Sequence, residues 1–122
     1  MNRVDEAKVI LAALGLPQAQ RNDIPITKHD KLPDIVALDP AREWLFLIEA
    51  VTSHGPVSAK RHEELELALK QARVGRVYVS AFLDFREFKR HAGEIAWETE
   101  VWIAEAPTHL LHYNGDRFFG PR

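Results

Sequence analysis

Two carboxylates, Asp34 and Glu49, stand where an acid is costly unless a cation meets it. Asp34 follows a proline at the start of "PDIVALD", and Glu49 comes directly after the apolar run "WLFLI". Because the strands of a hairpin lie side by side, we expect both carboxylates to come within reach of one ion. Mg²⁺ suits such oxygen ligands and is often held by one or two carboxylates together with water and substrate phosphates. This pattern is therefore compatible with metal-assisted hydrolysis of a phosphodiester.

The elements that must position these acids are a hairpin and a helix. The β-branched run 33–39 and the apolar run 43–51 predict two strands, joined by a tight turn at "DPAR". Ser58 is a good N-cap for a helix over 59–74, where leucines recur at helical spacing until a glycine ends the run. The segment 76–82, "RVYVSAF", predicts an interior strand. A strand, a helix and another strand favour a parallel crossover connection.

The remainder of the chain predicts further elements of the same kind. Asp84 can cap a helix over 85–96, and the segment 99–106, "TEVWIAEA", predicts another strand. Asn-Gly at 114–115 is a hairpin signal. The expected fold class is α/β, with a small mixed sheet flanked by helices.

Composition and length limit the kinds of protein that this chain can be. The 122 residues fit one domain, and we expect a helix and linker over 1–28 ahead of a core domain over 29–122. The absence of cysteine excludes disulfides and thiolate metal sites, and it suits a cytoplasmic location. No apolar run reaches the length of a membrane span. The net charge of −2 does not by itself favour nucleic-acid binding, although local basic patches can still bind phosphate.

The paired acids resemble the motif of the PD-(D/E)xK nuclease superfamily. In that motif, Pro-Asp is followed after a hairpin by Asp or Glu, one further residue and then Lys. Pro33, Asp34 and Glu49 match the first elements, but Val51 stands where the lysine belongs. Lys60 offers a substitute, since it lies in the first turn of the helix predicted behind the strand and has a long flexible stem.

A longer stretch is similar to one nuclease family. "KLPDIVALDPAREWLFLIEAVTSHGPVSAKR" and "AWETEVWIAEAPTHLLHYNGDRFFGPR" resemble the C-terminal part of the BsuBI/PstI type II restriction endonucleases, from about His29 to Arg122. The resemblance implies a PD-(D/E)xK fold and Mg²⁺-dependent cleavage of double-stranded DNA at a short palindrome by a homodimer. It also implies that Asp34 and Glu49 are metal ligands and that Lys60 is the catalytic cation. Family members are much longer, with a helical N-terminal region of which this chain has only a piece.

Five side chains are candidates for contacts with DNA. Ser53 and His54 follow the strand that carries Glu49, so they would lie at the mouth of the site. Arg61 is a candidate phosphate contact and a second candidate for the catalytic cation. Lys89 and Arg90 belong to a small basic cluster on the last predicted helix. Each also has an ordinary explanation, as a loop residue or as part of a solvated helix face.

A second class of function stays open at this point. The valine at position 51 and the acidic net charge are also compatible with a catalytically inactive module that binds DNA or dimerises. Such a module would keep the fold but need not bind a metal ion. A nuclease must bind one.

Overall fold

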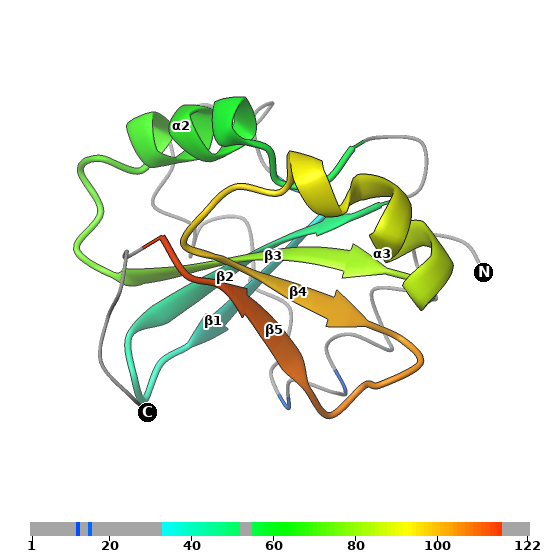
Figure 1. Cartoon of the computed structure of the whole chain (residues 1–122). Helices are drawn as coiled ribbons and strands as arrows, with labels where there is room; N and C mark the ends of the chain where they lie inside the picture. Colours follow the sequence, from blue (N-terminus) through cyan, green and yellow to red (C-terminus); the bar gives the residue numbers. More distant parts are fainter. Residues whose placement is uncertain (1–11, 13–14, 16–32, 52–54, 116–122) are drawn as a thin grey trace.

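A computed structural model describes residues 12, 15, 33–51 and 55–115 of the chain (Figure 1). The predicted N-terminal helix and linker over 1–28 lie outside the described residues, apart from Ala12 and Gly15. The elements, in chain order, are β1 (Ile35–Asp39), β2 (Trp44–Ala50), α2 (Ala59–Ala68), β3 (Gly75–Phe82), α3 (Phe85–His91), the 3₁₀ turn η3 (Ala92–Glu94), β4 (Thr99–Ile103) and β5 (Leu110–Tyr113).

The strands form one five-stranded mixed sheet in the order β1-β2-β3-β4-β5 (Figure 1). The β1–β2 hairpin is antiparallel, β2–β3 and β3–β4 are parallel, and β4–β5 is antiparallel. The predicted hairpin, the parallel crossover through α2 and the small mixed sheet are therefore confirmed. None of the helices within the described ranges is long and apolar enough to cross a membrane.

Helix α2 begins where the sequence predicts but ends earlier. Ser58 is its N-cap and accepts a hydrogen bond from the backbone N–H of Arg61. The predicted extent, 59–74, is wrong, because the helix ends at Ala68. Beyond the helix, the guanidinium of Arg76 donates to the carbonyls of Leu69 and Ala72. These carbonyls therefore have hydrogen-bond partners although the helix does not continue. Tertiary contacts thus override the local helical preference of this segment.

The segments that come after β3 are also shorter than predicted. Asp84 caps α3 as expected, but the helix stops at His91 and continues only as η3, not to residue 96. Ile95 leaves the helical conformation because it is buried in the core. Strand β4 ends at Ile103, and residues 104–109 connect it to β5. The hairpin predicted at the Asn-Gly pair, 114–115, stays a prediction, since residues 116–122 lie outside the described part of the chain.

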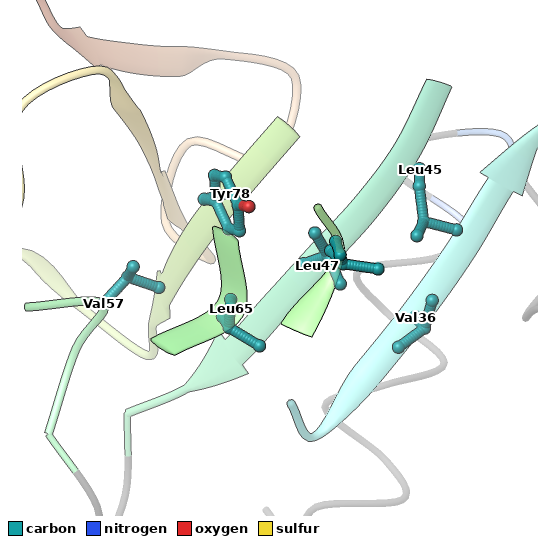
Figure 2. Packing of buried hydrophobic residues seen from close by; sticks show 7 residues of the cluster. Val36, Leu45, Leu47, Val57, Leu65 and Tyr78 are labelled. Atoms are coloured by element: carbon teal, nitrogen blue, oxygen red, sulfur yellow. The ribbon is translucent and has the colours of Figure 1, made fainter. Parts of the chain in front are cut away.

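One face of the sheet packs against α2 and α3. A cluster between β1, β2, β3 and α2 contains Val36, Leu45, Leu47, Val57, Leu65, Leu69 and Tyr78 (Figure 2). Next to it, Phe88 of α3 packs against a second cluster that includes Val51 and Phe82. The opposite face of the sheet carries a third buried cluster, formed by Ile35, Ala37, Phe46, Ile48, Val79, Ala81 and Trp102. Since side chains alternate along a strand, Glu49 lies on the face of Leu45 and Leu47, toward α2.

Candidate active site

The register of the β1–β2 hairpin places the two predicted acids side by side. Ile35 pairs with Ile48, so one further step along the antiparallel register sets Asp34 opposite Glu49. The backbone N–H of Ala50 donates to Asp34 Oδ2 at 3.0 Å, which fixes the Asp34 carboxylate beside β2. Residues directly opposite on antiparallel strands have Cβ atoms about 4.5–5.5 Å apart. The two carboxylates therefore share one face at one end of the hairpin.

Glu49 is a buried carboxylate that meets a guanidinium. Its residue exposure is 7%, and its Oε1 accepts a hydrogen bond of 2.9 Å from Nε of Arg61. The Arg61 side chain is 22% exposed, and its Nη1 also lies 3.6 Å from Oε2 of Glu64 on the same helix. A buried carboxylate is costly unless it is paired and hydrogen-bonded. The contact with Arg61 supplies that compensation and links α2 to the end of β2.

Two cationic side chains follow one another in the first turn of α2, and they point in different directions. Successive helical residues are about 100° apart around the axis. Arg61 contacts Glu49, whereas Lys60 is exposed and lines a shallow surface groove with Glu64 and Leu67. Of the two predicted candidates for the catalytic cation, Arg61 is thus the one that the structure places against an acid of the site.

The other predicted DNA contacts have different outcomes. Ser53 and His54 lie outside the described residues. Lys89 and Arg90 are exposed on α3, where Arg90 forms an ion pair of 3.0 Å with Glu87. Helix α3 packs over β3 and β4, on the same face of the sheet as α2 (Figure 1).

The pair of acids has the donor chemistry that a hard divalent cation needs. The described residues contain no group of three or more His, Cys, Asp or Glu side chains that could enclose a metal ion. Two carboxylates are still a suitable set for Mg²⁺, which keeps several waters and binds substrate phosphates at its other positions. The residues present therefore fit Mg²⁺ as an ion shared between protein, solvent and substrate.

Comparisons with known proteins assign the chain to a family. The model of the BsuBI/PstI restriction endonuclease domain matches residues 6–116, which is most of the chain. The chain belongs to this family. The predicted resemblance is therefore confirmed.

Relatives of this family member support the same assignment. The type II restriction enzyme BsuBI of Bacillus subtilis is 52% identical over 98 residues, which are 80% of this chain and 31% of that enzyme. The type II restriction enzyme AplI of Arthrospira platensis is 39% identical over 90 residues, 74% of this chain and 28% of that enzyme. The solved structure of SdaI restriction endonuclease matches with a TM-score of 0.69 and 38% identity, over 94% of this chain and 34% of that one. The chain thus spans about a third of the length of these relatives, and its fold is a restriction-endonuclease fold.

In this BsuBI/PstI family member, the position of the missing lysine belongs to the core. Val51 is 7% exposed and packs with Phe82 and Ile95 between the sheet and α3. An ammonium group there would be buried among apolar side chains, so a cation for the site has to come from elsewhere in the fold. On α2, Arg61 lies against Glu49, with its Nε 2.9 Å from Glu49 Oε1.

Sequence analysis did not identify Ser80 as part of this arrangement. Ser80 is fully buried in β3, and its register partner on β2 is Glu49. Its Oγ accepts a hydrogen bond of 2.9 Å from the backbone N–H of Val57, just before α2. The available signal was a polar residue inside the otherwise apolar run "VYVSAF".

Proposed function

We propose that this chain is the DNA-cleaving core of a type II restriction endonuclease and hydrolyses phosphodiesters of double-stranded DNA with Mg²⁺. One observation carries the proposal: Asp34 and Glu49 lie side by side on adjacent strands. Membership of the BsuBI/PstI family and the names of the relatives support it. Because the chain covers about a third of those relatives, their activity applies to it only as part of this proposal.

In this proposal, Asp34 and Glu49 hold the metal ion. When bound, Mg²⁺ supplies activation of water and offsets charge on the phosphoryl oxygens during hydrolysis. Glu49 is fixed by Arg61, and Asp34 by the backbone N–H of Ala50, so both acids are held in place before the substrate arrives. Preorganised ligands of this kind avoid part of the reorganisation cost during the reaction.

Arg61 and Lys60 are the proposed cations of the site. Arg61 contacts Glu49, and its planar guanidinium can bind a phosphate through two N–H groups. Lys60, which is exposed one residue earlier, remains the alternative catalytic cation, since its flexible stem can approach a bound phosphate from the solvent side. We propose Ser53, His54, Lys89 and Arg90 as further phosphate contacts.

The proposed partner is double-stranded DNA, bound by a homodimer. A symmetric recognition sequence is matched by a protein with two-fold symmetry, which would place one set of acids at each strand. A reducing cytoplasm suits the chain, which has no cysteine.

Plasmid cleavage tests this function with an internal control. We expect the wild-type chain to convert supercoiled plasmid to nicked or linear forms when Mg²⁺ is present, and not when EDTA replaces it. Asp34→Asn and Glu49→Gln keep the size of each side chain but remove the charge, and each should slow cleavage at least about 100-fold, since metal assistance contributes several kcal/mol. Asp39→Asn is the matched control, because Asp39 is a buried carboxylate at the other end of the same hairpin. Equal cleavage by all four proteins would disprove the proposal.

The burial of Val51 gives the alternative function its support, because the usual lysine position cannot supply a cation. An inactive DNA-binding or dimerisation module would leave the plasmid intact. Calorimetric titration with Mg²⁺ and with Ca²⁺ separates the two functions. A nuclease must bind these ions, and Glu49→Gln must abolish that binding. An inactive module need not bind the ions at all.

A further inference from the structure

Ser80 is a buried polar residue in an apolar strand. It is 0% exposed, and its neighbours Val79 and Ala81 belong to the cluster on the opposite face of the sheet. A hydroxyl buried in this way is destabilising unless it has a hydrogen-bond partner. Its partner is the backbone N–H of Val57, at 2.9 Å. Val57 is also 0% exposed, so this bond satisfies two buried groups at once.

The bond connects β3 to the start of α2. Val57 directly precedes Ser58, whose side chain caps the helix by accepting from the backbone N–H of Arg61 at 3.2 Å. The side chain of Arg61 then reaches Glu49, at 2.9 Å. Glu49 is the register partner of Ser80 on the adjacent parallel strand. The connections therefore form a closed ring from Ser80 through the start of α2 to Arg61 and Glu49, and back across the sheet.

A second contact holds the same segment. The backbone N–H of Ala96 donates to the carbonyl of Val57 at 2.9 Å, so both polar backbone groups of Val57 have partners. The carbonyl is held by the loop before β4, and the N–H by a side chain of β3. Of these two contacts, only the one from Ser80 depends on the identity of a side chain, so a single substitution can remove it.

We infer that Ser80 is a positioning residue of the site: its hydroxyl sets where α2 begins and hence where the Arg61 guanidinium meets Glu49. This inference rests on the proposed function for its catalytic consequence, but its structural part does not. Removing the hydroxyl leaves the N–H of Val57 buried without an acceptor, and the segment has to shift to satisfy it. A displacement of about 1 Å at a catalytic group can reduce a rate by up to 100-fold.

Nuclear magnetic resonance of the arginine Nε–H groups tests the structural part without DNA. In the wild type we expect the Arg61 Nε–H to exchange slowly with water, because it donates to a buried carboxylate. Ser80→Ala should make this exchange about tenfold faster. Ser80→Thr keeps the hydroxyl and should restore the slow exchange. Tyr113→Phe is the matched control, since it removes a hydroxyl that binds the carbonyl of Ala92, away from α2.

Faster exchange in Ser80→Ala, with wild-type behaviour in Tyr113→Phe and Ser80→Thr, supports the inference. Wild-type exchange of the Arg61 Nε–H in Ser80→Ala overturns it. Equal acceleration in Tyr113→Phe also overturns it, because the effect would then follow from general loosening of the fold. Because this measurement needs no DNA, it tests the structural part of the inference even if the chain does not cleave DNA.

A double-mutant cycle tests the catalytic consequence. If Ser80 acts through Arg61, Ser80→Ala should slow plasmid cleavage roughly tenfold in the wild type and have little effect in an Arg61→Gln background. Equal slowing in both backgrounds would show that Ser80 acts by another route and would overturn the inference. Failure of the proposed function has a different signature, because the wild type would then leave the plasmid intact or Asp34→Asn would cleave it as fast as the wild type.

Discussion

Single residues decide the chemistry of this site through the direction in which they point. Asp34 and Glu49 could be predicted as a pair, because the period of a strand and the short turn between the two strands determine which side chains face each other. The pairing of Glu49 with Arg61 could not be predicted in the same way. It depends on the rotation of α2 about its own axis, which the contacts of Ser58 and Val57 set. A rotation by one residue would have presented Lys60 instead.

The neighbouring cations can be distinguished by their separate effects on metal binding and on cleavage. Arg61→Gln removes a positive charge next to Glu49, so we expect Ca²⁺ to bind a few-fold more tightly, since like charges near an ion disfavour it. The same substitution should slow cleavage roughly 100-fold, because it removes the cation that we propose lies beside the phosphate. Lys60→Gln, on the exposed side of the helix, should change both quantities less than about threefold. Calorimetry and plasmid cleavage measure the two effects, and a larger loss of cleavage in Lys60→Gln would assign the catalytic role to Lys60.

Among the elements, helix starts could be predicted from sequence better than helix ends. Ser58 and Asp84 cap their helices through bonds to the backbone three residues ahead, which is a local pattern. The end of α2 instead depends on Arg76, which lies beyond the helix in sequence and binds the carbonyls after its last turn from β3. Gly75, the first residue of β3, packs closely against Trp44, where an added Cβ would lie 2.7 Å from the indole Cδ1. Neither contact could be derived from the helical periodicity of 59–74.

The two caps allow a prediction about which helix serves the site. Ser58→Ala and Asp84→Ala each remove one capping bond, so each should lower the free energy of unfolding by about 1 kcal/mol. Only Ser58→Ala should also slow cleavage, because α2 carries Arg61 and its cap bonds that residue directly. Urea unfolding measures the first effect and plasmid cleavage the second. If Asp84→Ala slowed cleavage as much as Ser58→Ala at equal stability, the link between the start of α2 and the site would be wrong.

On the scale of the whole molecule, a buried tyrosine couples the stability of the fold to alkaline pH. Tyr78 lies in the cluster beneath α2, among the apolar side chains of its neighbours (Figure 2). Burial, followed by the nearby carboxylate of Glu66, raises the pKa of Tyr78 far above its ordinary value. The hydroxyl has no hydrogen-bond partner of normal geometry within the described part of the chain. The native state therefore holds the phenolic proton more tightly than the unfolded chain does.

The stability of the fold therefore falls at alkaline pH. The unfolded chain loses the Tyr78 proton near pH 10, whereas the native state keeps it to higher pH, so stability is fully present below pH 10 and falls as the pH rises further. Tyr78→Phe should flatten this alkaline decline and cost little at pH 8, because no hydrogen bond of normal geometry is lost. Tyr113→Phe should instead cost about 1 kcal/mol at pH 8, since the Tyr113 hydroxyl donates to the carbonyl of Ala92 at 2.8 Å. Burial also raises the pKa of Tyr113, so this variant should flatten the decline only in part. Urea unfolding at pH 8 and pH 11 measures the free energy of unfolding of the wild type, Tyr78→Phe and Tyr113→Phe. A decline in this free energy that is as steep in Tyr78→Phe as in the wild type would contradict this account.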